Sequence, residues 1–184
     1  ISLTTIDLRN SKNDINNKIQ DSAFDFFIHS AGIHPIRQDL DNINIFHESI
    51  ELLRKLDKLF QKSEKIILIS SFINLINYEK NKISEKNYLK IYKQDNFYKK
   101  SKYITERLFK KLSSKYNKEL IIIYPCHVIG PNDNRVSPNG VFLLNMSKKK
   151  VKFFFDINYP ITDVREISLY IDFIIKKNLW KHRK

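Results

Sequence analysis

The chain of 184 residues contains one cysteine, three glycines and five prolines. A single cysteine, Cys126, excludes an internal disulfide framework and is typical of a reducing compartment. So few glycines and prolines exclude a disordered or loop-dominated chain. No apolar run has the length of a membrane-spanning helix, and no charged-then-apolar signal segment opens the chain. We therefore expect a cytoplasmic protein that makes no contact with a membrane.

The residues that are present suit one globular domain with a basic balance. Apolar residues make up 42% of the chain, which is enough for a sizeable core. The net charge of +13 could indicate a protein that binds nucleic acid. However, the lysines are spread along the chain, and the tightest run, residues 148–150, is short. No basic strand with interleaved aromatic residues is present either, so we predict no nucleic-acid partner.

Apolar patterning predicts alternating strands and helices. The strand patterns occupy residues 1–6, 24–28, 66–69, 120–124 and 151–155. Helical spacing of apolar residues covers the low teens to about 20, 43–60, 98–117, 143–149 and 167–177. A loop is expected at about 74–96 and a turn at 130–133. This alternation predicts a parallel sheet with helices on both faces, whose ligand binds beyond the carboxyl ends of the strands.

One helix carries a recognisable chemical pair, Tyr98 and Lys102. Positions four apart lie on one face of a helix, so the phenol and the ammonium are predicted neighbours. A nearby cation favours the phenolate of a tyrosine, which otherwise titrates near about 10. Such a tyrosine can exchange a proton with a substrate alcohol or carbonyl. The alternative is a tyrosine that only packs beside a solvated lysine.

Short motifs in a fixed order favour a proton-exchanging Tyr98 over a Tyr98 that only packs. They are Asp7-Leu8, residues 27–32, Asn44, Ser70-Ser71, Tyr98-x-x-x-Lys102 with Ser101 and Glu106, Pro125 with Gly130-Pro131, and residues 163–165. Together they resemble the extended branch of the short-chain dehydrogenase/reductase superfamily. That branch contains sugar-nucleotide epimerases, dehydratases and dihydroflavonol-reductase-like enzymes. The resemblance implies a Rossmann-like α/β fold.

The same resemblance implies roles for individual residues. The catalytic residues would be Ser71, Tyr98 and Lys102. The residues that bind the cofactor, NAD or NADP, would be Asp7, Leu8, His29, Ala31, Gly32, Tyr98, Lys102 and Pro125. The substrate would be a small molecule with a secondary alcohol or ketone. The resemblance also allows a homodimer, because the family often pairs through helices that correspond to about 43–61 and 98–116.

One departure from the family pattern concerns the glycines. The family begins with a strand, a glycine-rich turn and a helix that hold the pyrophosphate. The three glycines here, Gly32, Gly130 and Gly140, are too far apart to form that turn. We therefore expect a sheet that is incomplete at its N-terminal side. Residues 1–184 would form one partial NAD(P)-binding domain, with the beginning of a substrate lobe from about residue 131.

Two functional hypotheses remain open from the sequence. The first is an NAD(P)-dependent oxidoreductase or epimerase/dehydratase that uses the Ser71, Tyr98 and Lys102 set. The second is a non-catalytic remnant or binding module that keeps the fold without the cofactor cradle, so the activity of the chain by itself is undecided. No metal site is expected, because the histidines and Cys126 lack metal-ligand spacing. The sequence does not choose between NAD and NADP and does not name the substrate.

Overall fold

A computed structural model describes residues 3–6, 15, 17–19, 22–32, 43–77, 82–83, 97–133, 138–151 and 160–182. These residues fall into two compact units, which meet along the chain between Tyr124 and Pro125. The first unit contains the candidate site.

The first unit is built on a three-stranded parallel sheet. Its strands are β1 (Phe24–His29), β2 (Ser63–Ile69) and β5 (Glu119–Ile123), in the order β1-β2-β5. Ile66 pairs with Phe27 on one side and with Leu120 on the other. The central strand is buried at three consecutive residues, Ile66, Ile67 and Leu68, whose side chains alternate between the two faces of the sheet. The predicted parallel α/β arrangement is confirmed.

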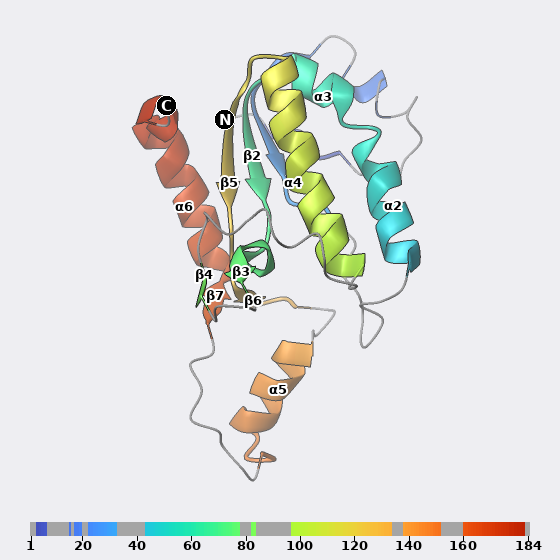
Figure 1. The fold of residues 1–184 in the computed structure, drawn as a ribbon. Coiled ribbons are helices and arrows are strands. Elements are labelled where there is room, and N and C mark those ends of the chain that lie inside the picture. Colours follow the sequence, from blue (N-terminus) through green and yellow to red (C-terminus); the bar gives the residue numbers. More distant parts are fainter. Residues whose placement is uncertain are drawn as a thin grey trace. The chain divides into compact units, whose positions relative to one another are not determined.

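Three helices of the first unit lie on the same side of this sheet (Figure 1). They are α2 (Ile43–Leu53), α3 (Asp57–Lys62) and α4 (Phe97–Lys115). Helix α4 contacts both α2 and α3 as well as β2. Its buried positions are Ser101, Tyr103, Glu106, Phe109, Leu112 and Ser113, and those from Tyr103 to Leu112 lie three residues apart. This spacing puts one stripe of the helix against the sheet and leaves Lys110 and Lys111 exposed.

Aromatic rings anchor α4 to the sheet. Phe109 is fully buried, and its ring lies 4.9 Å from that of Phe60, edge to face. The same ring stacks on Phe27 of β1, with 6.2 Å between centroids. Burial of an aromatic ring stabilises a core by several kcal/mol, roughly 3–5 when measured by truncation to alanine. The helix that carries Tyr98 and Lys102 is therefore fixed by its own buried middle.

Shorter elements complete the first unit after β2. A 3-10 helix, η2 (Phe72–Leu75), follows directly on Ser71, and β3 (Ile76–Asn77) pairs antiparallel with β4 (Lys82–Ile83). At the candidate site, the chain therefore passes from the end of β2 into the helical turn of η2 within three residues.

The second unit contains two short parallel strands and two helices. They are β6 (His127–Ile129), α5 (Pro138–Ser147), β7 (Ile161–Asp163) and α6 (Val164–Lys177), followed by the 3-10 helix η4 (Leu179–His182). Asp163 caps α6 by accepting a hydrogen bond from the backbone N–H of Arg165 at 2.8 Å. Asn178 ends α6 in the left-handed conformation. A Cβ atom at Gly130 would lie 2.3 Å from Val164, so only glycine fits beside the start of α6.

Some predicted elements differ from the structure. Residues 3–6 have no regular structure, so the strand predicted at 1–6 is wrong there; Leu3 is exposed, and a strand needs a neighbouring strand for its hydrogen bonds. The single helix predicted over 43–60 is broken at residues 54–56. The sequence pattern does not reveal this break, because the buried Leu56 continues the apolar spacing through it. Val151 is not in a strand, and residues 152–155 lie outside the described residues. Strands β6 and β7 were not predicted, since three residues carry too short a pattern.

Candidate active site

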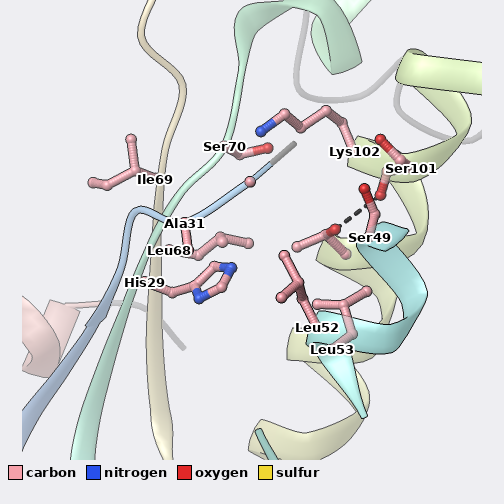
Figure 2. Close-up of a pocket in the computed structure, with 12 residues that line it drawn as sticks. His29, Ala31, Ser49, Leu52, Leu53, Leu68, Ile69, Ser70, Ser101 and Lys102 are labelled. Atoms are coloured by element: carbon pink, nitrogen blue, oxygen red, sulfur yellow. Dashed lines mark hydrogen bonds between the residues drawn. The ribbon is translucent and has the colours of Figure 1, made fainter. Parts of the chain in front are cut away.

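The first unit has a pocket at the carboxyl ends of β1 and β2. Residues of α2 and α4 close its other side (Figure 2). The lining residues are His29, Ala31, Gly32, Ser49, Leu52, Leu53, Leu68, Ile69, Ser70, Ser101, Lys102 and Thr105. This is the place where ligands of parallel α/β sheets bind. Among the residues that the sequence assigned to the site, the structure brings His29, Ala31, Gly32 and Lys102 together here.

Lys102 extends from α4 toward the strand ends, as Figure 2 shows. Its ammonium nitrogen approaches Gly32 so closely that a Cβ atom there would lie 2.9 Å from it. Burial lowers the pKa of Lys102 below its ordinary 10.5, and the negative charge of Glu106 opposes that shift. The pocket therefore contains one cation that sits beside exposed backbone of the β1 end.

Tyr98 and Ser71 lie next to each other at the start of α4 and the end of β2. The two side chains share a hydrogen bond, and the Lys102 nitrogen lies 5.6 Å from the centre of the Tyr98 ring. Ser71 Oγ also accepts a hydrogen bond from the backbone N–H of Ile73 at 3.4 Å. The structure thus places a phenol, a hydroxyl and an ammonium around one strand end.

The direction of the Tyr98 pKa shift corrects an expectation from the sequence. Burial raises the pKa of Tyr98 above 10.0, and the hydrogen bond from Ser71 only partly opposes this. The nearby lysine was expected to lower the pKa, whereas desolvation of the phenolate is the largest effect and raises it. Tyr98 is consequently a neutral phenol at pH 7, which is the form that donates a proton.

His29 is buried at the end of β1. Its ring lies 5.0 Å from the ring of Phe109. Burial, with a contribution from the nearby Lys102 charge, lowers the pKa of His29 to about 4. The imidazole is therefore neutral at pH 7, so it adds a hydrogen-bonding group to the pocket without adding charge.

Three other residues assigned from the sequence are not among the residues that line this pocket. Asp7 and Leu8 lie outside the described residues. Pro125 is buried and belongs to the second unit, directly after Tyr124 of the first.

Sequence reasoning gave no role to three hydroxyl groups of the pocket, those of Ser49, Ser70 and Thr105. Thr105 Oγ1 donates to the carbonyl of Ser101 at 2.8 Å. Helical spacing could have found Thr105, which lies four residues after Ser101 on the same face. Ser49 is a buried polar residue in a helix with an apolar pattern, and that contrast was its signal.

The described residues hold no cluster of three or more His, Cys, Asp or Glu side chains suited to a metal ion. Within the same part of the chain, no helix is both long and apolar enough to cross a membrane. The chemistry that the site offers is proton donation by a phenol beside an ammonium, where a substrate oxygen could accept it.

Solved structures share this fold. A UDP-glucose 4-epimerase from Thermus thermophilus, in complex with NAD, matches 92% of this chain with TM-score 0.66 and 14% sequence identity. A UDP-N-acetylglucosamine 4-epimerase from Bacillus cereus matches 91% with TM-score 0.67 and 17% identity. A dTDP-glucose 4,6-dehydratase from Streptomyces venezuelae matches 78% with TM-score 0.56 and 12% identity. The matches cover 58%, 58% and 44% of those proteins, so this chain spans less than two thirds of their length. At such identities the likeness shows the fold, which is Rossmann-like.

No curated protein sequence matches this chain significantly. A sequence model of one family, the NAD dependent epimerase/dehydratase family, matches residues 1–158. The match includes the strand ends, the Tyr98-x-x-x-Lys102 helix and the pocket, and it confirms the resemblance that those motifs indicated. The chain belongs to the NAD dependent epimerase/dehydratase family.

Proposed function

We propose that the protein is an NAD(P)-dependent oxidoreductase or epimerase/dehydratase that acts on a secondary alcohol or ketone. The observation that carries this proposal is the joint placement of Ser71, Tyr98 and Lys102, in which the first two share a hydrogen bond and the third lies over the Tyr98 ring. A sugar nucleotide is the first candidate substrate, since the structural neighbours include UDP-sugar epimerases. A small carbonyl compound of the dihydroflavonol-reductase type is the second.

The residues of the pocket fit a dinucleotide cofactor. Gly32 leaves the space that the Lys102 ammonium occupies, and the backbone of Ala31 and Gly32 is exposed beside it. An ammonium in that position can hold ribose hydroxyl groups by charge-assisted hydrogen bonds. When bound, NAD or NADP would supply hydride transfer at the reacting carbon.

The proton steps fall to the chain's own side chains. Tyr98, as a neutral phenol, would donate its proton to the substrate oxygen when a ketone is reduced, and would receive it in the reverse direction. Ser71 would hold the same oxygen by a hydrogen bond and keep it within reach of the phenol. Lys102, as a cation near the ring, would favour the phenolate that forms transiently.

A non-catalytic binding module is the second candidate function. The observation that favours it is the absence of any G-x-x-G-x-x-G sequence from the 184 residues. Such a module would keep the pocket but would not turn over a substrate.

We also propose a cytoplasmic location, from the single cysteine, and a homodimer through α2 and α4.

The test is turnover by the protein at millimolar cofactor, with UDP-glucose and UDP-N-acetylglucosamine in the presence of NAD or NADP and with a dihydroflavonol in the presence of NADH or NADPH. Tyr98→Phe, which removes only the phenol oxygen, should abolish turnover, whereas Tyr103→Phe on the same helix should not. Turnover that survives Tyr98→Phe would overturn the assignment. Specific binding of a nucleotide sugar without any turnover would favour the binding module.

A further inference from the structure

Glu106 is a fully buried acidic residue at the centre of the first unit. It has an exposed fraction of 0% and lies on α4, one turn after Lys102. An isolated carboxylate is costly to bury, so a residue of this kind needs hydrogen bonds or a counter-charge. A leucine would fill the same stripe of the helix without that cost, which indicates that the carboxylate has a task besides packing.

Three hydrogen bonds converge on this carboxylate. Ser70 Oγ and Asn74 Nδ2 both donate to Oε1. The hydroxyl of Tyr124 donates to Oε2 at 3.1 Å. The three donors come from the end of β2, from η2 and from the residue after β5, so one side chain of α4 is bonded to three other segments.

Two of these segments bear directly on the candidate catalytic residues. Ser70 precedes Ser71, and Asn74 closes the turn that follows it, with its backbone N–H donating to the Ser71 carbonyl at 3.1 Å. Ser70 is itself fixed to β5, because its N–H donates to the carbonyl of Ile123 at 2.8 Å. Glu106 thereby fixes the Ser71 backbone relative to the helix that carries Tyr98.

The negative charge of Glu106 stabilises the protonated form of Lys102. Among the described residues, the charged or titratable groups with contacts or interactions given for the Lys102 ammonium are Glu106 and Tyr98 from α4 and His29 from β1. His29 is neutral at pH 7 and Tyr98 is a phenol, so Glu106 is the anion among them. Its charge opposes the effect of burial, which disfavours the ammonium.

We propose that Glu106 is a positioning residue of this site, one that fixes Ser71 against Tyr98 and supplies the counter-charge for the Lys102 ammonium. The inference rests on the proposed function for the roles of Ser71, Tyr98 and Lys102. It adds a residue that touches neither substrate nor cofactor and acts through those that do.

The counter-charge is tested with Glu106→Gln, which keeps the shape and one acceptor oxygen but removes the charge. The pKa of the Lys102 ammonium is measured by NMR, with the signal assigned by its loss in Lys102→Arg. Glu106→Gln should lower this pKa by about one unit, a tenfold change in proton affinity. Ser113→Ala, which removes a buried hydroxyl of the same helix, should leave it unchanged. An unchanged Lys102 pKa in folded Glu106→Gln overturns the inference.

A second variant keeps the test decisive if Glu106→Gln does not fold. If folding fails because Lys102 is left without its counter-charge, the double variant Glu106→Gln/Lys102→Met should fold, since it removes both charges. A double variant that also fails to fold overturns the counter-charge.

The positional part is tested with Ser70→Ala, which removes one donor and leaves the charge. The pKa of Tyr98, followed by NMR of its ring carbon, should rise further as the hydrogen bond from Ser71 weakens, while that of Lys102 stays. An unchanged Tyr98 pKa overturns this part. None of these measurements needs cofactor or substrate, so the inference can fail while the proposed turnover stands, and the reverse.

Discussion

The ammonium nitrogen of Lys102 occupies the space that a side chain at Gly32 would need. A Cβ atom at Gly32 would approach it to 2.9 Å, closer than such atoms pack. The two residues are 70 positions apart in the chain, and the fold brings them together where the end of β1 faces α4. The glycine at the end of β1 therefore makes room for the lysine.

Gly32→Ala should displace Lys102 without unfolding the protein. None of the glycines has a positive φ, so alanine meets no backbone strain, and the atom it approaches is the end of a flexible side chain. We expect the ammonium to move outward and its pKa to rise toward 10.5, at a cost in unfolding free energy of about 1 kcal/mol or less. NMR of Lys102 and thermal unfolding check both values.

The control for this prediction is Ser30→Ala, an exposed position two residues earlier. It should change neither the Lys102 pKa nor the unfolding midpoint. An unmoved Lys102 signal in Gly32→Ala would contradict the steric argument.

The buried His29 should make the stability of the fold depend on pH. Its pKa is about 4 in the folded chain and 6.5 when exposed, so the unfolded state binds more protons between these values. The free energy of unfolding should therefore fall as pH decreases from about 6.5 to 4, by about 3 kcal/mol at most. His29→Gln should remove this part of the pH dependence, as measured by urea unfolding at several pH values. The exposed His47→Gln is the control, and an equal loss in both variants would refute the assignment.

Phe109 should be one of the costliest positions of the first unit. Its fully buried ring contacts Phe60, Phe27 and His29. Phe109→Ala should destabilise the fold by roughly 3–5 kcal/mol, because the cavity it leaves lies between α4 and the sheet. Phe142→Ala on α5, where the ring is exposed, should change the unfolding free energy by less than about 1 kcal/mol. Denaturant unfolding of the two variants gives the comparison.

The sequence predicts helices and strands of the fold correctly where their apolar patterns are long. The continuous run at Ile66–Leu68 predicts β2, and the spacing of buried residues from Ser101 to Leu112 predicts α4. The same spacing hid the break at residues 54–56, since a buried Leu56 continues the period although the backbone turns. Periodicity records which side chains are buried, and it does not record whether the backbone between them stays helical.

For the candidate site, the sequence predicts only the local geometry of residues that are close together in the chain. The four-residue spacing of Tyr98 and Lys102 places them on one face, but the Tyr98 pKa depends on burial by segments distant in sequence, and its direction was mispredicted. The Glu106 network joins donors 36, 32 and 18 residues away, and no spacing rule connects them. Motif order identifies candidate residues, whereas desolvation and long-range hydrogen bonds come only from the packed structure.

The last prediction concerns the cofactor. Most dinucleotide affinity in such folds comes from backbone N–H groups of a glycine-rich turn at a helix N-terminus, and residues 1–184 contain no such turn. Charge-assisted hydrogen bonds contribute roughly 1.5–3 kcal/mol each, so the lack of two or three should weaken binding about a thousandfold or more. We expect residues 1–184 to bind NADH and NADPH in the millimolar range at best, as measured by fluorescence titration. Fusing a strand–glycine-turn–helix–strand segment ahead of Ile1 should restore binding, and Lys102→Ala should then abolish turnover, whereas the exposed Lys111→Ala on the same helix should not. Micromolar affinity of residues 1–184 would show instead that the pocket around Gly32 and Lys102 suffices to hold the cofactor.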